Sequence, residues 1–133
     1  MTDKKALLPP EWPRPRGYAN GVSARGRMVF VAGMIGWNER NEFASDRLAD
    51  QAAQALTNAV AVLAAGGALP SHIVRMTWYV TDKREYLAAG KAVGAAFREL
   101  VGHYGIAMSA VQVAALIEDS AKVEIEATAV IPD

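Results

Sequence analysis

Cysteine is absent from the 133-residue sequence, and so are the short motifs that most often identify a catalytic chemistry. Without a thiol, the chain can form no disulfide, no thiolate nucleophile and no thiolate metal site. There is no glycine-rich phosphate loop, no Gly-x-Ser-x-Gly nucleophile elbow and no His-Glu-x-x-His zinc motif. The two histidines, His72 and His103, stand far apart in the sequence, so we expect no metal site.

An excess of charge of either sign is also missing. Fourteen Lys and Arg residues balance fourteen Asp and Glu residues. Nucleic acids and acidic membrane surfaces attract proteins with a positive field, so this balance argues against both as partners. No run approaches the ~20 apolar residues of a membrane-spanning helix, and residues 1–12 contain no apolar signal core. We therefore expect a cytoplasmic protein, and its length suits one domain.

Strand-like and helical periodicity alternate along the chain and predict an α+β domain. Four prolines between Pro9 and Pro15 forbid a helix and favour an extended N-terminal arm over residues 1–17. The elements expected in the remaining domain, residues 18–133, are strands at 19–24 and 28–32 joined by a turn at 25–27, a helix from Ser45 to the Gly66–Gly67 pair, a strand at 72–81, a helix at 83–101, and strands at 106–116 and 123–130. This order is typical of a mostly antiparallel sheet with both helices on one face.

Two glycines, Gly90 and Gly94, are four residues apart in the second predicted helix. Glycine lowers helix propensity by about 1 kcal/mol relative to alanine. We therefore interpret the pair as positions where this helix packs closely against the sheet or the first helix.

The strand at 72–81 has two faces that are both unsuited to bare solvent. Its even-numbered residues from Val74 to Val80 are apolar and form one face. The other face, formed by Arg75, Thr77 and Tyr79, has a single charge and an aromatic ring. We expect helices to cover the first face and a partner subunit to cover the second.

The last strand also alternates, and it places two carboxylates, Glu124 and Glu126, on the side opposite its apolar residues. Glutamate is depleted in strands, and two interpretations remain open. Either both carboxylates are solvated on a wet sheet face, or one of them lines a pocket.

Five segments resemble, in order and spacing, the RidA family, which is also called YjgF or L-PSP. They are residues Gly17–Gly21, Val29–Gly36, Gln51–Asn58, Val74–Asp82 and Val123–Ala127. The resemblance covers nearly the whole chain from Tyr18 onward. It implies a chorismate-mutase-like fold and a homotrimer with the sheets inside, the helices outside and small-molecule clefts between subunits. In active members these clefts hydrolyse enamines and imines to keto acids and ammonia without a cofactor.

The resemblance also assigns roles to residues of this chain. Glu124 matches the pocket carboxylate that positions or deprotonates the attacking water. The positions that match substrate-binding residues are Tyr18, Ala32, Gly33, Met34, Gly90, Met108 and Ala110.

Several of these positions depart from the family pattern. Met108 stands where active members have an arginine that clamps the substrate carboxylate, and methionine has no charge and no donor. Ala32 and Met34 replace a serine and a glutamine, and Gly90 replaces an asparagine. We expect Met108, Ala110 and Gln112 to share one strand face, which makes the pocket apolar with Gln112 near its edge.

Three functions follow from this pattern. The first is a divergent enamine/imine deaminase-type hydrolase that acts on a less acidic or larger substrate. The second is a non-catalytic trimer that binds a small ligand or regulates a partner, which the loss of polar pocket residues favours. The third is the endoribonuclease activity attached to the family name, and the charge balance argues against it.

Overall fold

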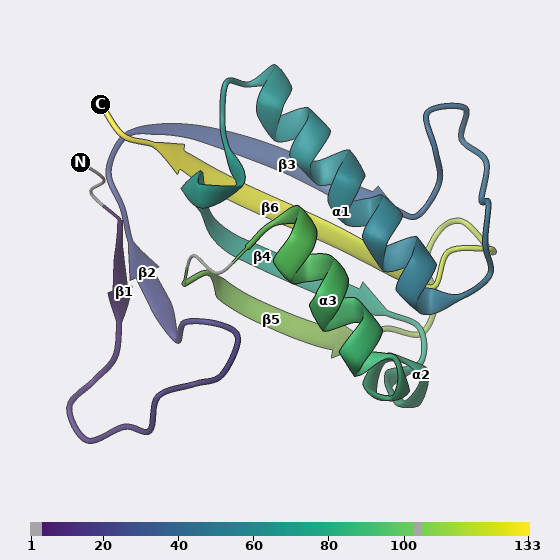
Figure 1. Cartoon of the computed structure of the whole chain (residues 1–133), viewed down its shortest axis with the longest axis horizontal. Coiled ribbons are helices and arrows are strands. Elements are labelled where there is room, and N and C mark those ends of the chain that lie inside the picture. The colour runs from purple at the N-terminus through teal and green to yellow at the C-terminus, as the bar shows by residue number, and fades with distance from the viewer. Residues whose placement is uncertain (1–3, 103–104) are drawn as a thin grey trace.

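The computed structural model describes residues 4–102 and 105–133, and its sheet is built around the alternating C-terminal strand. In that strand, every second residue from Val123 to Ala129 is buried. The four strands in spatial order are β3 (Arg27–Ile35), β6 (Val123–Ile131), β4 (Ile73–Val80) and β5 (Ala107–Gln112). β6 is antiparallel to both of its neighbours, whereas β4 and β5 are parallel (Figure 1). The predicted α+β class and mostly antiparallel sheet are confirmed.

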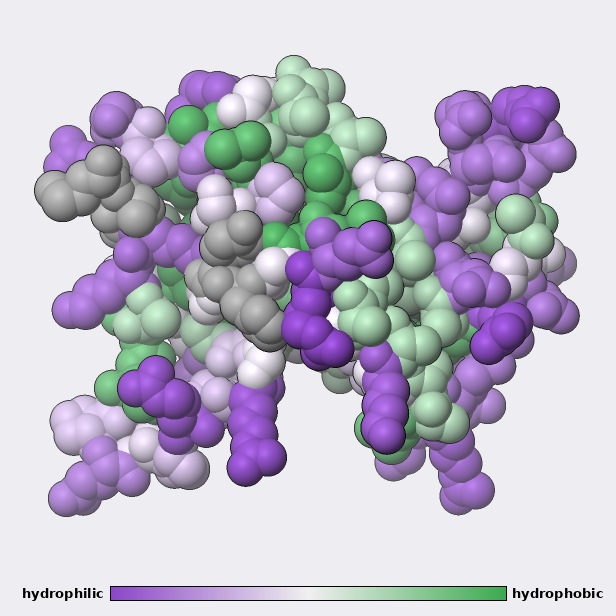
Figure 2. Space-filling model, viewed as in Figure 1, coloured by the Kyte–Doolittle hydropathy of each residue, from purple (hydrophilic) through white to green (hydrophobic). Residues whose placement is uncertain are grey.

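Two helices, α1 (Leu48–Ala65) and α3 (Gly90–Leu100), cover one face of this sheet (Figure 1). The apolar stripe of α1 packs on β3 and β6, and it forms one core with the buried alternating residues of β4 and β6. The largest side chains buried there are Leu56, Leu63, Ile73, Met76, Trp78 and Ile125. On the helix side, Figure 2 shows apolar side chains over α1 and over the region of α2 and α3. Within the described ranges, no helix has both the length and the apolar character needed to span a membrane.

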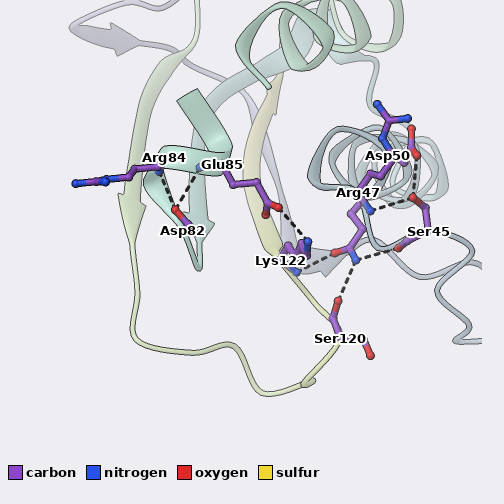
Figure 3. Close-up of polar contacts among 9 residues, drawn as sticks. Ser45, Arg47, Asp50, Asp82, Arg84, Glu85, Ser120 and Lys122 are labelled. Atoms are coloured by element: carbon purple, nitrogen blue, oxygen red, sulfur yellow. Dashed lines mark hydrogen bonds and ion pairs between the residues drawn. The ribbon is translucent and has the colours of Figure 1, made fainter. Parts of the chain in front are cut away.

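The second predicted helix is divided into two. α2 (Lys83–Ala88) ends at Ala89, and α3 begins at Gly90. The Asp82 side chain caps α2 by accepting hydrogen bonds from the backbone N–H groups of Arg84 and Glu85, at 2.9 and 3.2 Å (Figure 3). The prediction of one continuous helix over 83–101 was therefore wrong at this junction, where a glycine follows two alanines.

The expected close packing at Gly90 and Gly94 was also wrong. A Cβ placed on Gly90 would meet no heavy atom within 4 Å, outside its own helix backbone and chain neighbours. A Cβ on Gly94 would meet only the guanidinium of Arg98, at 3.4 Å. Both glycines border open space instead.

The first helix begins later than predicted. α1 starts at Leu48, and its N-cap residue Arg47 makes no side-chain cap. Ser45 lies two residues earlier, where its hydroxyl accepts from the Arg47 N–H at 3.0 Å and donates to Asp50 Oδ2 at 2.8 Å (Figure 3). Ser45 thus stabilises the turn before the helix rather than capping it.

Gln51 joins two loops to α1 although its side chain is only 1 % exposed. Its Nε2 donates to the carbonyls of Ser45 and Ser120 at 3.1 and 2.9 Å, and its Oε1 accepts from the Lys122 N–H at 2.8 Å (Figure 3). These bonds fix the loop that leads into β6. Both N–H donors of the amide are therefore used in this structural role.

The N-terminal arm is attached to the domain by a small second sheet. β1 (Lys5–Leu7) pairs antiparallel with β2 (Gly21–Ser23). Lys4 Nζ donates to the Ile73 carbonyl at 2.8 Å. The turn after β2 contains Gly26, whose φ of 144° suits glycine. β2 therefore pairs with the arm, whereas β3 pairs with β6.

The face of the sheet opposite the helices is open in the single chain. On β3, Phe30 is 69 % exposed and Met28 is 54 % exposed. The same face includes Thr77 and Tyr79 of β4, opposite Glu126 and Glu124 of β6. We call this surface, which extends over β3, β6 and β4, the open sheet face.

Candidate functional site

Glu124 lies over an irregularity in the pairing of β3 with β6. The register shifts between Val31 and Met34, which places Ala32 and Gly33 in a β-bulge. A Cβ on Gly33 would collide with the Glu124 carboxylate. Glycine is therefore required for the close approach of the backbone to this carboxylate. The structure thus brings together Glu124, Gly33 and Ala32 from the predicted site.

The open sheet face next to Glu124 carries further polar groups. Tyr79 lies opposite Glu124 in the register, and its phenol donates to Glu126 Oε1 at 2.6 Å. That hydrogen bond is the main reason why the pKa of Tyr79 is raised, with desolvation and the charges of both carboxylates adding to it and Arg75 opposing it. A hollow of about 390 Å³ adjoins this group. It is lined by Phe30, Val31, Ala32, Arg75, Thr77, Glu126, Ala127 and Thr128.

Met108 belongs to a second cluster on the other side of the sheet. It pairs in register with the buried Met76 and packs against the core. It borders an apolar cavity of about 240 Å³ under α3. The lining residues are Gly17, Trp78, Tyr86, Leu87, Gly90, Val93, Gly94, Phe97, Arg98 and Met108. Gly90 and Met108 are therefore together, but within one chain they lie on the opposite face of the sheet from Glu124.

The remaining predicted residues lie around or away from these two clusters. Tyr18 is exposed and follows Gly17 of the apolar cavity. Met34 packs against the core. Ala110 is exposed on β5, paired with Trp78. Gln112 was expected near the pocket edge, but its Oε1 accepts from the Lys83 N–H at 2.8 Å and so holds the start of α2.

Sequence reasoning missed the aromatic walls of the apolar cavity. The Trp78 ring centroid lies 6.1 Å from that of Tyr86 and 6.3 Å from that of Phe97. Burial raises the pKa of the Tyr86 phenol, so this wall carries no charge at neutral pH. The available signal was the Gly90–Gly94 pair, which we interpreted as close packing rather than as a space.

His72 adds no catalytic group to these clusters. His72 Nδ1 accepts from the Leu69 N–H at 3.0 Å, at a short 3-10 helix (Pro70–His72). His103 lies outside the described residues. In the described ranges, no three His, Asp or Glu side chains converge in a way that could hold a metal ion.

Comparisons with known proteins give a consistent result. Residues 13–131 match the family model described as Endoribonuclease L-PSP. The chain is 34 % identical over 133 residues to the 2-iminobutanoate/2-iminopropanoate deaminase of Dermatophagoides farinae, covering 98 % of this chain and 99 % of that protein. It is 34 % identical over 113 residues to the protein of the same name from Escherichia coli strain K12, covering 85 % and 86 %.

Solved structures agree with this result. A protein of unknown function of the conserved Rid family from Yersinia pestis superposes with a TM-score of 0.85 and 29 % identity, covering 98 % of this chain and 100 % of that chain. E. coli TdcF with bound serine gives a TM-score of 0.69 and 34 % identity, with coverage of 96 % and 98 %.

Proposed function

This chain belongs to the RidA family, also called YjgF or L-PSP, and we propose that it is an enamine/imine deaminase-type hydrolase with an altered substrate pocket. The proposal is supported by two relatives that are named as imine deaminases and match nearly all of the chain or of its domain. The observation that carries it is the Glu124 carboxylate, which lies over Gly33 at the bulge of β3.

The proposed reaction needs a positioned water and a base. The enamine first tautomerises to the imine. Glu124 accepts a proton from water while the water oxygen adds to the imine carbon and the nitrogen is protonated. The resulting carbinolamine then releases ammonia as the carbon–oxygen double bond forms. Each turnover consumes one imine and one water and yields one carbonyl compound and one ammonia, with no redox step.

Substrate recognition must differ from that implied for active members of the family. Met108 offers no bidentate contact to a carboxylate, and Gly90 offers no side-chain amide. The cavity that both residues border has mainly apolar walls. We therefore infer a substrate that is larger or less acidic than the small α-imino acids.

The proposed active unit is a homotrimer closed over the open sheet face. Exposed Phe30 and Met28 on that face support a partner there. A second reason for a partner is that Glu124 and Met108 lie on opposite faces of the sheet within one chain. A small substrate can contact both residues only if the two residues come from different copies of the chain. We infer that the clefts between subunits join the carboxylate of one copy to the apolar cavity of its neighbour.

Ammonia release from freshly generated imines tests the proposal. The panel contains imines with and without a carboxylate, and the control is Glu124→Gln, which removes the base while keeping the side-chain size. We expect turnover of uncharged or aromatic imines and its loss in the variant. No ammonia from any imine, with a folded trimer, would overturn the proposed hydrolase.

The second candidate is a non-catalytic trimer that binds a small ligand or regulates a partner. It is favoured by the apolar character of the cavity at Met108 and Gly90. Ligand-dependent stabilisation without ammonia release would support it. The endoribonuclease activity is less well supported, because the chain has no net positive charge. Cytoplasmic localisation stays a prediction.

A further inference from the structure

The apolar cavity under α3 has room for a small apolar group. Its volume is about 240 Å³. An apolar cavity of roughly 150 Å³ can hold benzene, whereas sites for drug-sized ligands begin at about 300 Å³. The cavity therefore suits one ring or one branched aliphatic group.

Its walls suit a flat apolar group. Trp78, which lines the cavity, forms tilted aromatic contacts with Tyr86 and with Phe97, which line it as well. Such edge or offset contacts between rings are favourable beyond the burial of their area. A further ring placed beside them would extend the same arrangement.

Two of the glycines that line the cavity, Gly17 and Gly90, leave room around their backbone. No heavy atom outside the local backbone lies within 4 Å of a Cβ placed on either residue. Gly90 is also exposed, at the start of α3. A larger side chain at Gly90 would therefore occupy space at the border of the cavity.

The cavity also has one charged residue in its lining. Arg98 is exposed at the cavity, so an acid with an apolar group can be accommodated.

We propose that this cavity is the side-chain pocket of the substrate, and that it selects a single-ring or branched apolar group. The effect of this pocket on catalysis rests on the proposed function, whereas ligand binding to the cavity does not depend on turnover. It identifies the substrate class as imines with a phenyl-sized group next to the reacting carbon. Gly90 and Trp78 are the residues that determine this specificity.

Binding can be tested with keto acids, which resemble the products and cannot be hydrolysed further. Phenylpyruvate and pyruvate carry the same α-keto carboxylate, so the ratio of their dissociation constants reports only on the apolar group. Isothermal titration calorimetry of the full chain should give phenylpyruvate a Kd at least tenfold lower than pyruvate. Equal dissociation constants for the two acids would overturn the proposal.

Gly90→Leu places a branched side chain at the cavity, and Ala95→Leu is the matched control, because Ala95 is exposed on α3 and does not line the cavity. A Cβ on Gly90 meets no heavy atom within 4 Å, so Gly90→Leu should fold with an unchanged or higher Tm. The Gly90 variant should weaken phenylpyruvate binding at least tenfold and leave pyruvate binding unchanged, whereas Ala95→Leu should keep both dissociation constants within threefold of the wild type. If Gly90→Leu does not fold, Gly94→Leu tests the same space from the next turn. Wild-type phenylpyruvate binding in a folded Gly90→Leu or Gly94→Leu variant would overturn the proposal.

Trp78→Phe keeps an aromatic ring at the cavity but makes it smaller. It should weaken phenylpyruvate binding about threefold and leave pyruvate binding unchanged, because only the apolar group of the ligand contacts this ring. The same change for both ligands would remove Trp78 from the specificity residues. If the protein releases no ammonia from any imine but still binds phenylpyruvate more tightly than pyruvate, the hydrolase proposal is refuted and the proposed apolar pocket is not.

Discussion

The two faces of the sheet differ in what they keep of the site implied by the family resemblance. The open sheet face holds the carboxylate of Glu124 over Gly33, together with a second carboxylate bound to the Tyr79 phenol. The helix face holds Met108 and Gly90 at an apolar cavity, where the resemblance implies an arginine and an asparagine. The carboxylate that we propose activates water and the residues that we propose recognise the substrate are therefore on separate surfaces of one chain, so one set can change without the other.

Replacing the carboxylate should have the largest effect. Glu124→Gln removes the proposed base and should lower kcat about 10²–10⁴-fold, as measured by ammonia release. Glu126→Gln is the matched control two residues away on the same face. It retains an acceptor for the Tyr79 phenol and should keep kcat within about tenfold of the wild type, since a hydrogen bond is worth roughly 1 kcal/mol. Equal losses of kcat in Glu124→Gln and Glu126→Gln would contradict the proposal that only Glu124 acts as the base.

Assembly should depend on the open sheet face and not on the helix face. Light scattering of the wild type should give the mass of three 14.2-kDa chains. Phe30→Glu places a charge in the proposed subunit interface and should give smaller species with little ammonia release. The control is Val62→Glu, at an exposed valine on α1 that does not line the apolar cavity, which should remain trimeric. A wild-type protein of monomer mass would refute the trimer.

The two glycines give a direct contrast between the faces. At Gly33 a Cβ collides with the Glu124 carboxylate, whereas at Gly90 it enters open space. Gly33→Ala should displace the carboxylate and lower kcat about 10²-fold. Gly90→Ala should lower kcat far less than Gly33→Ala and should stabilise the fold by about 0.4–1 kcal/mol. Thermal unfolding and ammonia assays on both variants measure this contrast, which similar kcat values would contradict.

The smallest expected effect is on the titration of Tyr79. Its pKa is raised chiefly by the hydrogen bond to Glu126, so the folded state favours the neutral phenol. The associated stabilisation is present below the usual tyrosine pKa of about 10 and is lost as pH rises through the higher folded value. The difference in ultraviolet absorbance between wild type and Tyr79→Phe should show that the Tyr79 phenolate forms above pH ~10. In a protein that carries Glu126→Gln, the same phenolate should form at a lower pH than in the wild type. Normal titration in the wild type would contradict the assignment.

The fold could be predicted where burial alone sets the pattern. The alternation of β6 and the apolar stripe of α1 follow directly from which residues must avoid water. The junction at Ala89 could not be found in this way, because alanine favours continuation of the helix. Pairing of β1 with β2 depends on contacts distant in the sequence.

The candidate site could be predicted only in part. Glu124 and Gly33 each follow from the resemblance, and the structure brings them into contact. The separation of Met108 from Glu124 depends on strand register, which pairs Met108 with Met76 and Glu124 with Tyr79. A one-residue change in register would reverse these faces, and the sequence does not specify register to that accuracy. The cavity was missed because the space beside Gly90 depends on how α3 is placed.

The most direct test probes residues on both faces of the sheet in one kinetic experiment. Ammonia release would be measured from the imines of phenylalanine and alanine, each generated freshly by an amino-acid oxidase, with wild type, Glu124→Gln and Gly90→Leu. The account predicts that the wild type favours the phenylalanine imine, that Glu124→Gln lowers kcat for any imine that is turned over, and that Gly90→Leu raises KM for the phenylalanine imine alone. Rapid wild-type turnover of the alanine imine, unaffected by either substitution, would contradict it.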